Sequence, residues 1–481
     1  MKLSELLKDT PHTLIGCDGG LEITGICRDS RRAAPGSVFV AIRGYQADGH
    51  RFVPEAMAAG CAAAVVETPP DDKGPYIVVP DSRRALATLA NTFFGYPAQS
   101  MKLVGVTGTN GKTTTTHLLK GLIEQCTGQK VGLIGTNHIL FGDEVIPAER
   151  TTPESYELFR LLGAMRDAGC AWVVMEVSSH SLALDRVYGL HFAAAAFTNL
   201  TRDHLDFHGT MEAYAQAKSK LFTRCDAAVL NADDPWHKVM REAAQCPCTT
   251  YSAQSDSADL VAKNIRLMAD HVEFEAVTTG NIGRVRLAIP GMFSVYNALC
   301  AVGVGLALGF DFQQVVAAMR NLHGVTGRIE VVPTNTDYTV IIDYAHSPDG
   351  MENVLRAVRG FAQNRVIALF GCGGNRDKTK RPIMGKTGGD LADVCVVTTD
   401  NPRDEDPQSI IDDILPGMKG CPAEVHVVVD RREAIRYALD LAQPGDVVVL
   451  MGKGHETYQE VRGVKLHLDE REEIAAYFEG K

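Results

Sequence analysis

The sequence lacks an excess of basic residues. Among its 481 residues, 48 are Lys or Arg and 59 are Asp or Glu, which gives a formal net charge of −11. A protein that binds duplex nucleic acid needs a basic face that replaces the counterions of the phosphate backbone. The acidic balance therefore argues against nucleic-acid binding. It leaves room for an anionic small ligand, because a local pocket can be basic inside an acidic protein.

Long hydrophobic runs are also missing. The longest, residues 298–310, contains 13 residues, three of them glycine, and is too short to cross a bilayer. The N-terminal segment M-K-L-S-E-L-L-K contains no apolar core of the kind found in signal peptides. We therefore expect a soluble, cytoplasmic protein without membrane insertion, and we expect it to be a monomer.

The twelve cysteines follow no C-x-x-C spacing, and Cys246 and Cys248 form the only close pair in the chain. A disulfide framework or a zinc site would favour regular spacing. The scatter indicates free thiols in a reducing compartment, and a disulfide or zinc framework is the less favoured alternative. Low-complexity segments and repeats of solenoid period are absent too.

Patterning divides the chain into three blocks, in agreement with the roughly three domains that its length suggests. We predict an α/β fold with a small N-terminal α/β domain (1–98), a central P-loop parallel-sheet ATPase domain (99–330) and a C-terminal doubly wound, Rossmann-like domain (331–481). Strand-like runs alternate with helical stretches in the two larger blocks, which is typical of parallel sheets covered on both faces. Residues 257–289 alternate like an antiparallel insert. The predicted strands are 37–42, 62–67, 76–79, 102–107, 131–134, 172–177, 193–197, 227–230, 340–343, 366–370, 394–398, 424–429 and 446–451.

A glycine-rich loop, G-T-N-G-K-T-T, lies between a predicted strand and a predicted helix. Glycines allow several backbone N–H groups to face one anion, and the helix N-terminus adds partial positive charge. The general phosphate-loop pattern would place glycine where this chain has Val106, so the loop is a shortened variant. ATP is the favoured ligand, and a plain helix-capping turn is the alternative. The expected ATP-binding residues of the loop are Gly108, Thr109, Asn110, Gly111, Lys112, Thr113 and Thr114.

Polar groups follow the next two predicted strands, where active groups gather in open parallel sheets. Glu176 ends one strand, and Asn199, Asp203 and His204 follow the other. The Glu176 carboxylate is a candidate Mg²⁺ ligand, or else it caps the following turn. His204 is a candidate metal ligand or a structural histidine.

The third block offers a second group of charged residues at predicted strand ends. Arg376 lies in a glycine loop, D-N-P-R occupies 400–403, and G-K-G-H-E occupies 452–456. Arginine can grip a carboxylate through two parallel hydrogen bonds. The combination suits a zwitterionic amino acid, and a loop salt-bridge network is the alternative. Arg328, near the junction of the second and third blocks, is a candidate for a nucleotide phosphate or for a surface ion pair.

Four motifs in order resemble one known family. They are the loop at 108–114, E-V-S-S-H at 176–180, N-L-T-R-D-H at 199–204 and D-Y-A-H-S-P at 343–348. Together they resemble the Mur ligases, over essentially the whole chain. The segments D-S-R at 29–31, G-S-V-F-V-A at 36–41 and G-Y-Q-A-D-G at 44–49 are similar to the family's UDP-binding domain, and D-N-P-R at 400–403 is similar to members that add meso-diaminopimelate.

The resemblance implies an ATP-dependent ligase of peptidoglycan precursor synthesis. Its expected substrates are ATP, meso-2,6-diaminopimelate and a UDP-N-acetylmuramoyl dipeptide, whose D-glutamate γ-carboxylate is activated as an acyl phosphate. Mg²⁺ is the expected cofactor. The alternatives are an L-lysine-adding member, the related folylpolyglutamate synthase, and a P-loop ATPase that makes no peptide bond. The first block argues against the folate enzyme, which lacks a comparable UDP-binding domain.

The resemblance also assigns roles by motif. It implies catalytic roles for Lys112, Glu176, His204 and Lys218, with Lys218 carbamylated to N6-carboxylysine. The implied Mg²⁺ ligands are Thr113, Thr114, Glu176, His204 and modified Lys218. Asn297 would approach adenine, and Arg328 would complete the ATP site. The implied contacts of the UDP substrate are Ser30, Gln46, Ala47, Thr151, Thr152, Ser178 and Arg186. Those of diaminopimelate are Arg376, Asp400, Asn401, Arg403, Gly452 and Glu456. Arg403 would grip the distal carboxylate, which lysine lacks.

Overall fold

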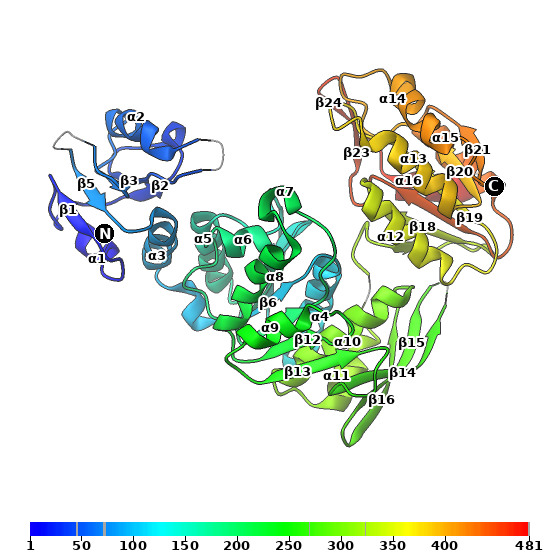
Figure 1. Ribbon diagram of the computed structural model, residues 1–481, viewed down its shortest axis with the longest axis horizontal. Coiled ribbons are helices and arrows are strands. Elements are labelled where there is room, and N and C mark those ends of the chain that lie inside the picture. Colours follow the sequence, from blue (N-terminus) through cyan, green and yellow to red (C-terminus); the bar gives the residue numbers. More distant parts are fainter. Residues whose placement is uncertain (45–46, 71–73, 269, 323, 480–481) are drawn as a thin grey trace. The chain divides into compact units, whose positions relative to one another are not determined.

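The computed structural model describes residues 1–44, 47–70, 74–268, 270–322 and 324–479 (Figure 1). They form two compact units. One contains Met1–Thr250 and Gly303–Phe310, and the other contains Tyr251–Val302 and Asp311–Lys481. Sheets with helices packed on them make up both units, so the predicted α/β class is confirmed.

The first sheet lies near the N-terminus and has the strand order β1-β5-β4-β3-β2. Its strands pair in parallel except β1, which is antiparallel to β5. One face packs on α1 and α3, and the other packs on α2. The strands are β1 (Thr13–Ile15), β2 (Gly25–Cys27), β3 (Ser37–Val40), β4 (Ala63–Val66) and β5 (Tyr76–Val78), and the helices are α1 (Leu3–Leu6), η1 (Ser30–Arg32), η2 (Gly49–Phe52), α2 (Val53–Ala58), α3 (Ser82–Phe93) and η3 (Pro97–Ser100).

The second sheet of this unit places β6 at its centre, between β11 and β10. Five strands run in parallel in the order β12-β11-β6-β10-β7, and the antiparallel β8 and β9 follow β7. Side chains of α5, α6, α8 and α9 cover one face, and α4 packs on β6, β10 and β7. Because the strands are parallel, the turns after β6, β10 and β11 meet at one edge. The strands are β6 (Lys102–Thr107), β7 (Val131–Ile134), β8 (His138–Phe141), β9 (Glu144–Pro147), β10 (Trp172–Glu176), β11 (Ala194–Phe197), β12 (Ala228–Asn231) and β13 (Cys248–Ser252), and the helices are α4 (Lys112–Thr127), α5 (Ser155–Asp167), α6 (Ser179–Ala183), α7 (Leu205–His208), α8 (Met211–Ser219), η4 (Lys220–Arg224) and α9 (His237–Ala243).

The other unit begins with an antiparallel meander, as predicted for residues 257–289. It comprises β14 (Leu260–Leu267), β15 (Val272–Thr278) and β16 (Asn281–Leu287). Helix α11 (Phe312–Met319) packs on β16, where a side chain at Gly283 would collide with Phe312. Helix α10 (Met292–Ala307) includes most of the longest apolar run of the sequence.

The same unit contains a larger sheet with the order β17-β18-β22-β19-β20-β21, parallel except at β17. Helices α12, α13 and α14 cover one face, and α15 and α16 cover the other. This is the doubly wound arrangement predicted for the third block. The elements are β17 (Glu330–Val332), β18 (Thr339–Asp343), α12 (Pro348–Arg359), β19 (Val366–Phe370), α13 (Lys380–Leu391), β20 (Val394–Val397), α14 (Pro407–Ile414), η5 (Leu415–Met418), β21 (Glu424–Val427), α15 (Arg431–Leu441), β22 (Val447–Met451), the hairpin β23 (Tyr458–Val461) and β24 (Val464–His467), and α16 (Glu470–Glu479).

The structure also bears on the cysteines and on membrane-spanning segments. All twelve cysteines are free thiols, six of them buried and six half-buried. Within the described ranges, no helix has the length and apolar character needed to span a bilayer.

Candidate active site

The glycine loop joins β6 to α4 and closes on itself. The Lys112 ammonium donates to the carbonyls of Gly108 at 3.0 Å and Thr109 at 2.8 Å. Gly108 has φ 149° and Gly111 has φ 84°, and a side chain at Gly108 would overlap Thr198. Glycine is therefore required at 108 on both conformational and steric grounds.

Residues after β11 hold this loop from the side. The Asn110 amide donates to Asn199 Oδ1 at 2.9 Å, and the Asn199 side-chain amide donates back to the Asn110 carbonyl at 3.2 Å. The Thr198 hydroxyl donates to the same carbonyl at 2.6 Å. The strand-end polar group predicted at Asn199 thus fixes the loop rather than facing solvent.

The Glu176 carboxylate lies at the start of α4. It is fully buried and accepts from the Thr113 hydroxyl at 2.9 Å and from the Thr136 amide at 2.8 Å, both at Oε1. The Thr136 hydroxyl donates to Oε2 at 3.0 Å. A side chain at Gly135 would approach Oε1 to 2.6 Å, so the carboxylate fits only beside glycine. The structure therefore brings Glu176 and Thr113 together, and Thr136 is a partner that the sequence analysis missed.

Lys218 lies beneath the same loop. Lys218 is 1% exposed. Its Nζ donates to the Gly108 carbonyl at 2.7 Å and lies 4.6 Å from the ring centroid of Tyr214. Burial and the positive charge of Lys112 hold the pKa of this amine well below its ordinary value. A lowered pKa increases the neutral fraction of the amine, which is the form that reacts with carbon dioxide.

His204 is the N-cap of the short α7 and has a left-handed conformation, φ 53°, with a half-exposed side chain. Its ring centroid is 4.8 Å from that of His180 and 6.2 Å from that of Tyr214. Burial and the neighbouring His180 lower the pKa of His208 in the same cluster to about 4. In the part of the chain that the structure describes, no contact joins His204 directly to Glu176 or the loop, and no group of three or more His, Cys, Asp or Glu residues is arranged to hold a metal. Thr114 is half-buried in the first turn of α4.

Four of the residues assigned to the UDP substrate lie close together, next to Glu176 and Thr136. The Thr152 hydroxyl donates to the Glu176 carbonyl at 2.8 Å and accepts from the Ser178 amide at 3.0 Å. Arg186 donates to the Thr152 carbonyl at 3.2 Å, and burial lowers the pKa of this guanidinium. The Thr151 hydroxyl lies 3.1 Å from that of Thr136, which links this group to the Glu176 carboxylate.

The remaining predicted UDP contacts lie in the first sheet region. The Ser30 hydroxyl donates to Glu55 at 3.0 Å, and the Ala47 carbonyl accepts from the Gly44 amide. Gln46 lies outside the described residues. A cavity of about 490 Å³ opens nearby, beside the residue that precedes Ser30. Its charged lining was not predicted and consists of Arg28, Asp29, Arg32, Glu149, Arg150, Glu154, Glu157 and Arg160.

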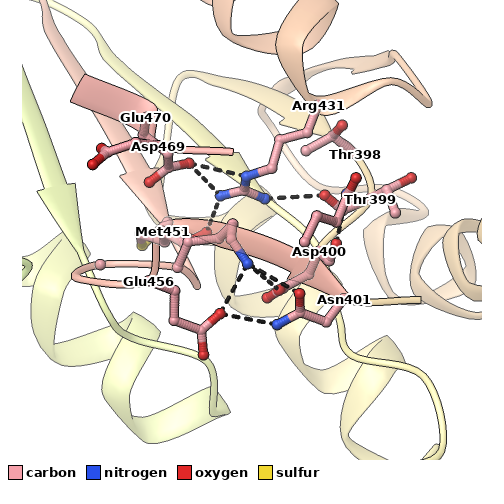
Figure 2. A network of polar contacts seen from close by, with 12 residues as sticks. Thr398, Thr399, Asp400, Asn401, Arg431, Met451, Glu456, Asp469 and Glu470 are labelled. Atoms are coloured by element: carbon pink, nitrogen blue, oxygen red, sulfur yellow. Dashed lines mark hydrogen bonds and ion pairs between the residues drawn. The ribbon is translucent and has the colours of Figure 1, made fainter. Parts of the chain in front are cut away.

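Three of the diaminopimelate candidates of the second unit, Asp400, Asn401 and Glu456, lie in one network (Figure 2). The Lys453 ammonium donates to Asn401 Oδ1 at 3.0 Å and to Glu456 Oε2 at 2.8 Å. The Asn401 side-chain amide also donates to Glu456 Oε2, at 2.9 Å. Gly452 has φ 114°, and a side chain there would approach Asp400 Oδ2 to 2.7 Å. Lys453, which the sequence analysis did not assign, is therefore the centre of the predicted group.

Both predicted arginines lie close to the glycine loop after β19, and Arg376 belongs to that loop. Arg403 donates to the Gly374 carbonyl at 2.8 Å and to Glu460 at 3.1 Å, and its side chain is 22% exposed. Arg376 is exposed. A side chain at Gly373 would approach Arg403 to 3.0 Å and Arg376 to 3.7 Å, so both arginines lie close to this glycine.

The buried ion pair of Arg431 and Glu470 lies next to this site. Arg431 donates to Glu470 at 2.9 and 2.8 Å, to the Thr399 carbonyl at 3.2 Å and to the Met451 carbonyl at 2.9 Å (Figure 2). It thereby ties the end of β22 to the segment after β20, next to Asp400. Arg431 and Glu470 are far apart in sequence, and no motif signals their pairing.

Two predicted ATP contacts belong to the second unit. Asn297 is buried in α10. Arg328 lies 5.2 Å from the ring centroid of Tyr344. Burial raises the pKa of the Asp343 carboxyl, and the positive charge of Arg328 offsets part of this rise. Their part in an ATP site stays a prediction.

Known proteins resemble this chain over its full length. Three family models match: the Mur ligase family catalytic domain at residues 22–94, the Mur ligase middle domain at 106–305 and the Mur ligase glutamate ligase domain at 327–454. The UDP-N-acetylmuramoyl-L-alanyl-D-glutamate–2,6-diaminopimelate ligase of Caldanaerobacter subterraneus subsp. tengcongensis is 45% identical over 478 residues, which is 98% of each chain. The enzyme of that name from Geobacillus kaustophilus is 44% identical over 480 residues, again 98% of each chain.

Solved structures of related ligases also resemble this chain. A structure of a UDP-N-acetylmuramoyl-L-alanyl-D-glutamate–2,6-diaminopimelate ligase matches with a TM-score of 0.76 and 32% identity over 100% of this chain and 99% of that chain. A folylpolyglutamate synthase of Mycobacterium tuberculosis matches with a TM-score of 0.62 and 18% identity, over 77% of this chain and 92% of that chain. The second likeness shows a shared fold alone.

Proposed function

The chain belongs to the Mur ligase family, and on that basis we propose that it adds meso-2,6-diaminopimelate to UDP-N-acetylmuramoyl-L-alanyl-D-glutamate with consumption of ATP. Diaminopimelate ligases are 45% and 44% identical to it over 98% of their length. The observation in the chain itself that carries the choice of amino acid is that Arg403 and Asn401 both lie near Gly373 and that Glu456 accepts from Asn401, which places a cation and a carboxylate in one region.

The reaction joins a carboxylate to an amine in two steps. An oxygen of the D-glutamate γ-carboxylate attacks the γ-phosphorus of ATP, the bond to the β-phosphate oxygen breaks, and ADP leaves an acyl phosphate behind. An amine of diaminopimelate then attacks the acyl carbon. The tetrahedral intermediate expels inorganic phosphate, and the amine proton passes to solvent. No nucleophilic side chain is needed, because positioning and charge stabilisation suffice.

The phosphate loop supplies most of that stabilisation. The N-terminus of α4 directs backbone N–H groups and partial positive charge toward a bound phosphate. Lys112 now donates to carbonyls of its own loop, and it would transfer these hydrogen bonds to phosphate oxygens when ATP binds. The Lys112 ammonium then offsets charge on the transferred phosphoryl group.

Mg²⁺ fits the residues present. Thr113 and Glu176 offer a hydroxyl and a carboxylate 2.9 Å apart, and such oxygen donors, completed by phosphates and water, are what Mg²⁺ prefers. Thr114 and His204 complete the proposed set, together with Lys218 in its carbamylated form. When bound, the ion would offset negative charge on the phosphates.

Carbamylation of Lys218 would resolve an otherwise unfavourable arrangement. As an ammonium this side chain is buried close to Lys112 and cannot serve as a metal ligand. The neutral amine attacks carbon dioxide and loses a proton, which gives an anionic carbamate with two oxygen donors. Its location directly under Gly108 is the support for this proposal.

Discrimination against L-lysine would reside in Arg403. The distal end of diaminopimelate carries a carboxylate and an ammonium, whereas that of lysine carries an ammonium alone. Arg403 uses two of its nitrogens within the chain, Nε and Nη1, and Nη2 has no partner among the described residues. If L-lysine bound instead, this N–H group of Arg403 would face no carboxylate and would lack a hydrogen-bond partner. Such a buried polar group without a partner is the strongest basis for rejecting the wrong amino acid.

Product analysis tests the proposal. Purified protein would be incubated with ATP, Mg²⁺, UDP-N-acetylmuramoyl-L-alanyl-D-glutamate and meso-diaminopimelate, and the product mass would be measured. We expect a mass equal to the sum of nucleotide substrate and diaminopimelate less one water, and no such product from Lys112→Met. Phosphate release without any joined product would contradict the proposal and indicate an ATPase.

A further inference from the structure

Lys453 has no assigned role, yet it occupies the centre of the amino-acid site. Its side chain is fully buried, at 0% exposure, while Glu456 beside it remains 16% exposed. Nζ donates to Asn401 and Glu456 and lies 3.9 Å from Asp400 Oδ1 and 5.4 Å from the ring centroid of Tyr458. An ammonium enclosed in this way reaches neighbouring side chains and not a substrate.

The backbone around Lys453 is built to keep it there. Gly452 and Gly454 both have positive φ, 114° and 55°. A side chain at Gly452 would approach Asp400, and one at Gly454 would approach Tyr344 to 2.6 Å. The Glu456 amide closes the turn by donating to the Lys453 carbonyl at 2.9 Å. The turn therefore fixes Lys453 and Glu456 relative to each other and to Asp400.

The Lys453 ammonium also fixes the orientation of the Asn401 and Glu456 side chains. Asn401 Oδ1 accepts from Lys453 and from the Glu460 amide at 2.9 Å, while Nδ2 donates to Glu456. With donors on one side and an acceptor on the other, the Asn401 amide has a single favourable orientation. Figure 2 shows Asn401 and Glu456 pointing toward each other, with Asp400 beside Asn401.

One carboxylate oxygen remains for a ligand. Glu456 Oε2 receives both internal hydrogen bonds, whereas Oε1 has no hydrogen-bond partner among the described residues. Without the ammonium, the carboxylates of Glu456 and Asp400 would share a partly buried site with no cation between them. Like charges in such a site repel, and one of them would protonate or move.

We infer that Lys453 is a positioning residue of the amino-acid site, whose buried ammonium fixes Asn401 and Glu456 so that Glu456 Oε1 receives an ammonium group of the incoming diaminopimelate. The inference rests on the proposed function, because it concerns the amine substrate of that reaction. Lys453 itself makes no contact with the substrate and acts through Glu456.

The test compares Lys453→Met with Lys465→Met. Lys465 is a matched control because its ammonium also lies on the Tyr458 ring, 4.1 Å from the centroid, but the side chain is exposed. For Lys453→Met we expect the KM for meso-diaminopimelate to rise about 10- to 100-fold, which is the effect of disrupting one buried charged contact. The KM values for ATP and for the UDP dipeptide should stay within about twofold, as should all constants of Lys465→Met.

A second readout bypasses the amino-acid site. Hydroxylamine attacks the acyl carbon of the intermediate, phosphate leaves and a hydroxamate forms, so its yield reports acyl phosphate formation alone. Lys453→Met should form hydroxamate at the wild-type rate. Loss of hydroxamate as well would overturn the inference, since Lys453 would then support the whole enzyme. An unchanged KM for diaminopimelate would overturn it too.

A charge-balanced double variant covers the case in which Lys453→Met does not fold. Lys453→Met combined with Glu456→Gln removes one charge of each sign, and its KM for diaminopimelate should equal that of Glu456→Gln alone. A KM far above that of Glu456→Gln would show that Lys453 acts independently of Glu456 and would overturn the inference. If wild-type protein shows no diaminopimelate-dependent turnover, the proposed function itself fails.

Discussion

Two buried lysines in this protein are held in opposite ways. Lys453 has a carboxylate at 2.8 Å, a second one at 3.9 Å and an amide oxygen at 3.0 Å. Lys218 has one carbonyl partner at 2.7 Å, an aromatic ring and a second lysine nearby, and the pKa of its amine is lowered strongly. A buried cation with anionic partners holds its neighbours in place. A buried amine without such partners is destabilising as an ammonium and is available for chemistry.

The contrast predicts which lysine limits catalysis most. Lys218→Met should lower the rate of phosphate release by about 100- to 1,000-fold, because the carbamate that supports the transferred phosphoryl group cannot form. Lys220→Met, at an exposed position two residues later, is the control and should retain full activity. Steady-state kinetics at saturating substrates measures both. Near-normal activity of Lys218→Met would remove the chemical role of this lysine.

For stability we expect the opposite order: replacing Lys453 should destabilise the protein more than replacing Lys218. Lys453→Met leaves Glu456 and Asp400 without their cation and should destabilise its unit by about 3–5 kcal/mol. Lys218→Met should cause no such loss. Thermal unfolding of both variants in the same buffer gives the comparison, and an equal decrease in both would show that the two lysines are held alike.

The pH dependence of stability should identify Lys218 as the strained group. Its pKa is lowered on folding, so the unfolded chain binds more protons at neutral pH, and the stability of the native protein rises with pH. In carbonate-free buffer we expect Lys218→Met to be more stable than wild type by about 1–3 kcal/mol at neutral pH. The difference should shrink as pH rises toward 10.5, the ordinary pKa of a lysine side chain. A difference that is constant with pH would contradict this explanation.

The smallest effect should come from the aromatic partner. Tyr214 contributes its ring to Lys218 and its hydroxyl to Thr109 at 3.2 Å. Tyr214→Phe keeps the ring and should reduce the rate by no more than about fivefold, the typical effect of one neutral hydrogen bond. Tyr214→Leu removes the ring and should reduce the rate further. Equal rates for the two variants would show that the ring does not help to hold Lys218.

Local motifs made much of the fold and of the candidate site predictable from the sequence. The residue pattern that marks the loop from Gly108 to Thr114 is local, so the position of the loop between β6 and α4 could be predicted from the sequence alone. Most strands of the parallel sheets were predicted within one or two residues, since buried parallel strands are continuous apolar runs, but β2 and β13 were missed. The antiparallel hairpins β8–β9 and β23–β24 were not predicted, because their strands are partly exposed.

Partners that come from distant segments were beyond prediction. Thr136 meets Glu176 only because β7 and β10 are neighbours in the sheet. Arg431 meets Glu470 through the packing of α15 on α16, and 39 residues separate them. Lys453 was visible in its motif, but its burial depends on the turn between Gly452 and Gly454. Pairings of this kind arise from tertiary packing, and no local pattern encodes them.

The central claim, ligation of diaminopimelate rather than lysine, is tested most directly by competition. Equal concentrations of meso-diaminopimelate and L-lysine would be offered with ATP, Mg²⁺ and UDP-N-acetylmuramoyl-L-alanyl-D-glutamate, and the two products would be quantified by mass. We predict that the diaminopimelate product dominates by at least about 100-fold, and that Arg403→Ala narrows this ratio. A dominant lysine product, or phosphate release that is the same without either amino acid, would contradict the account.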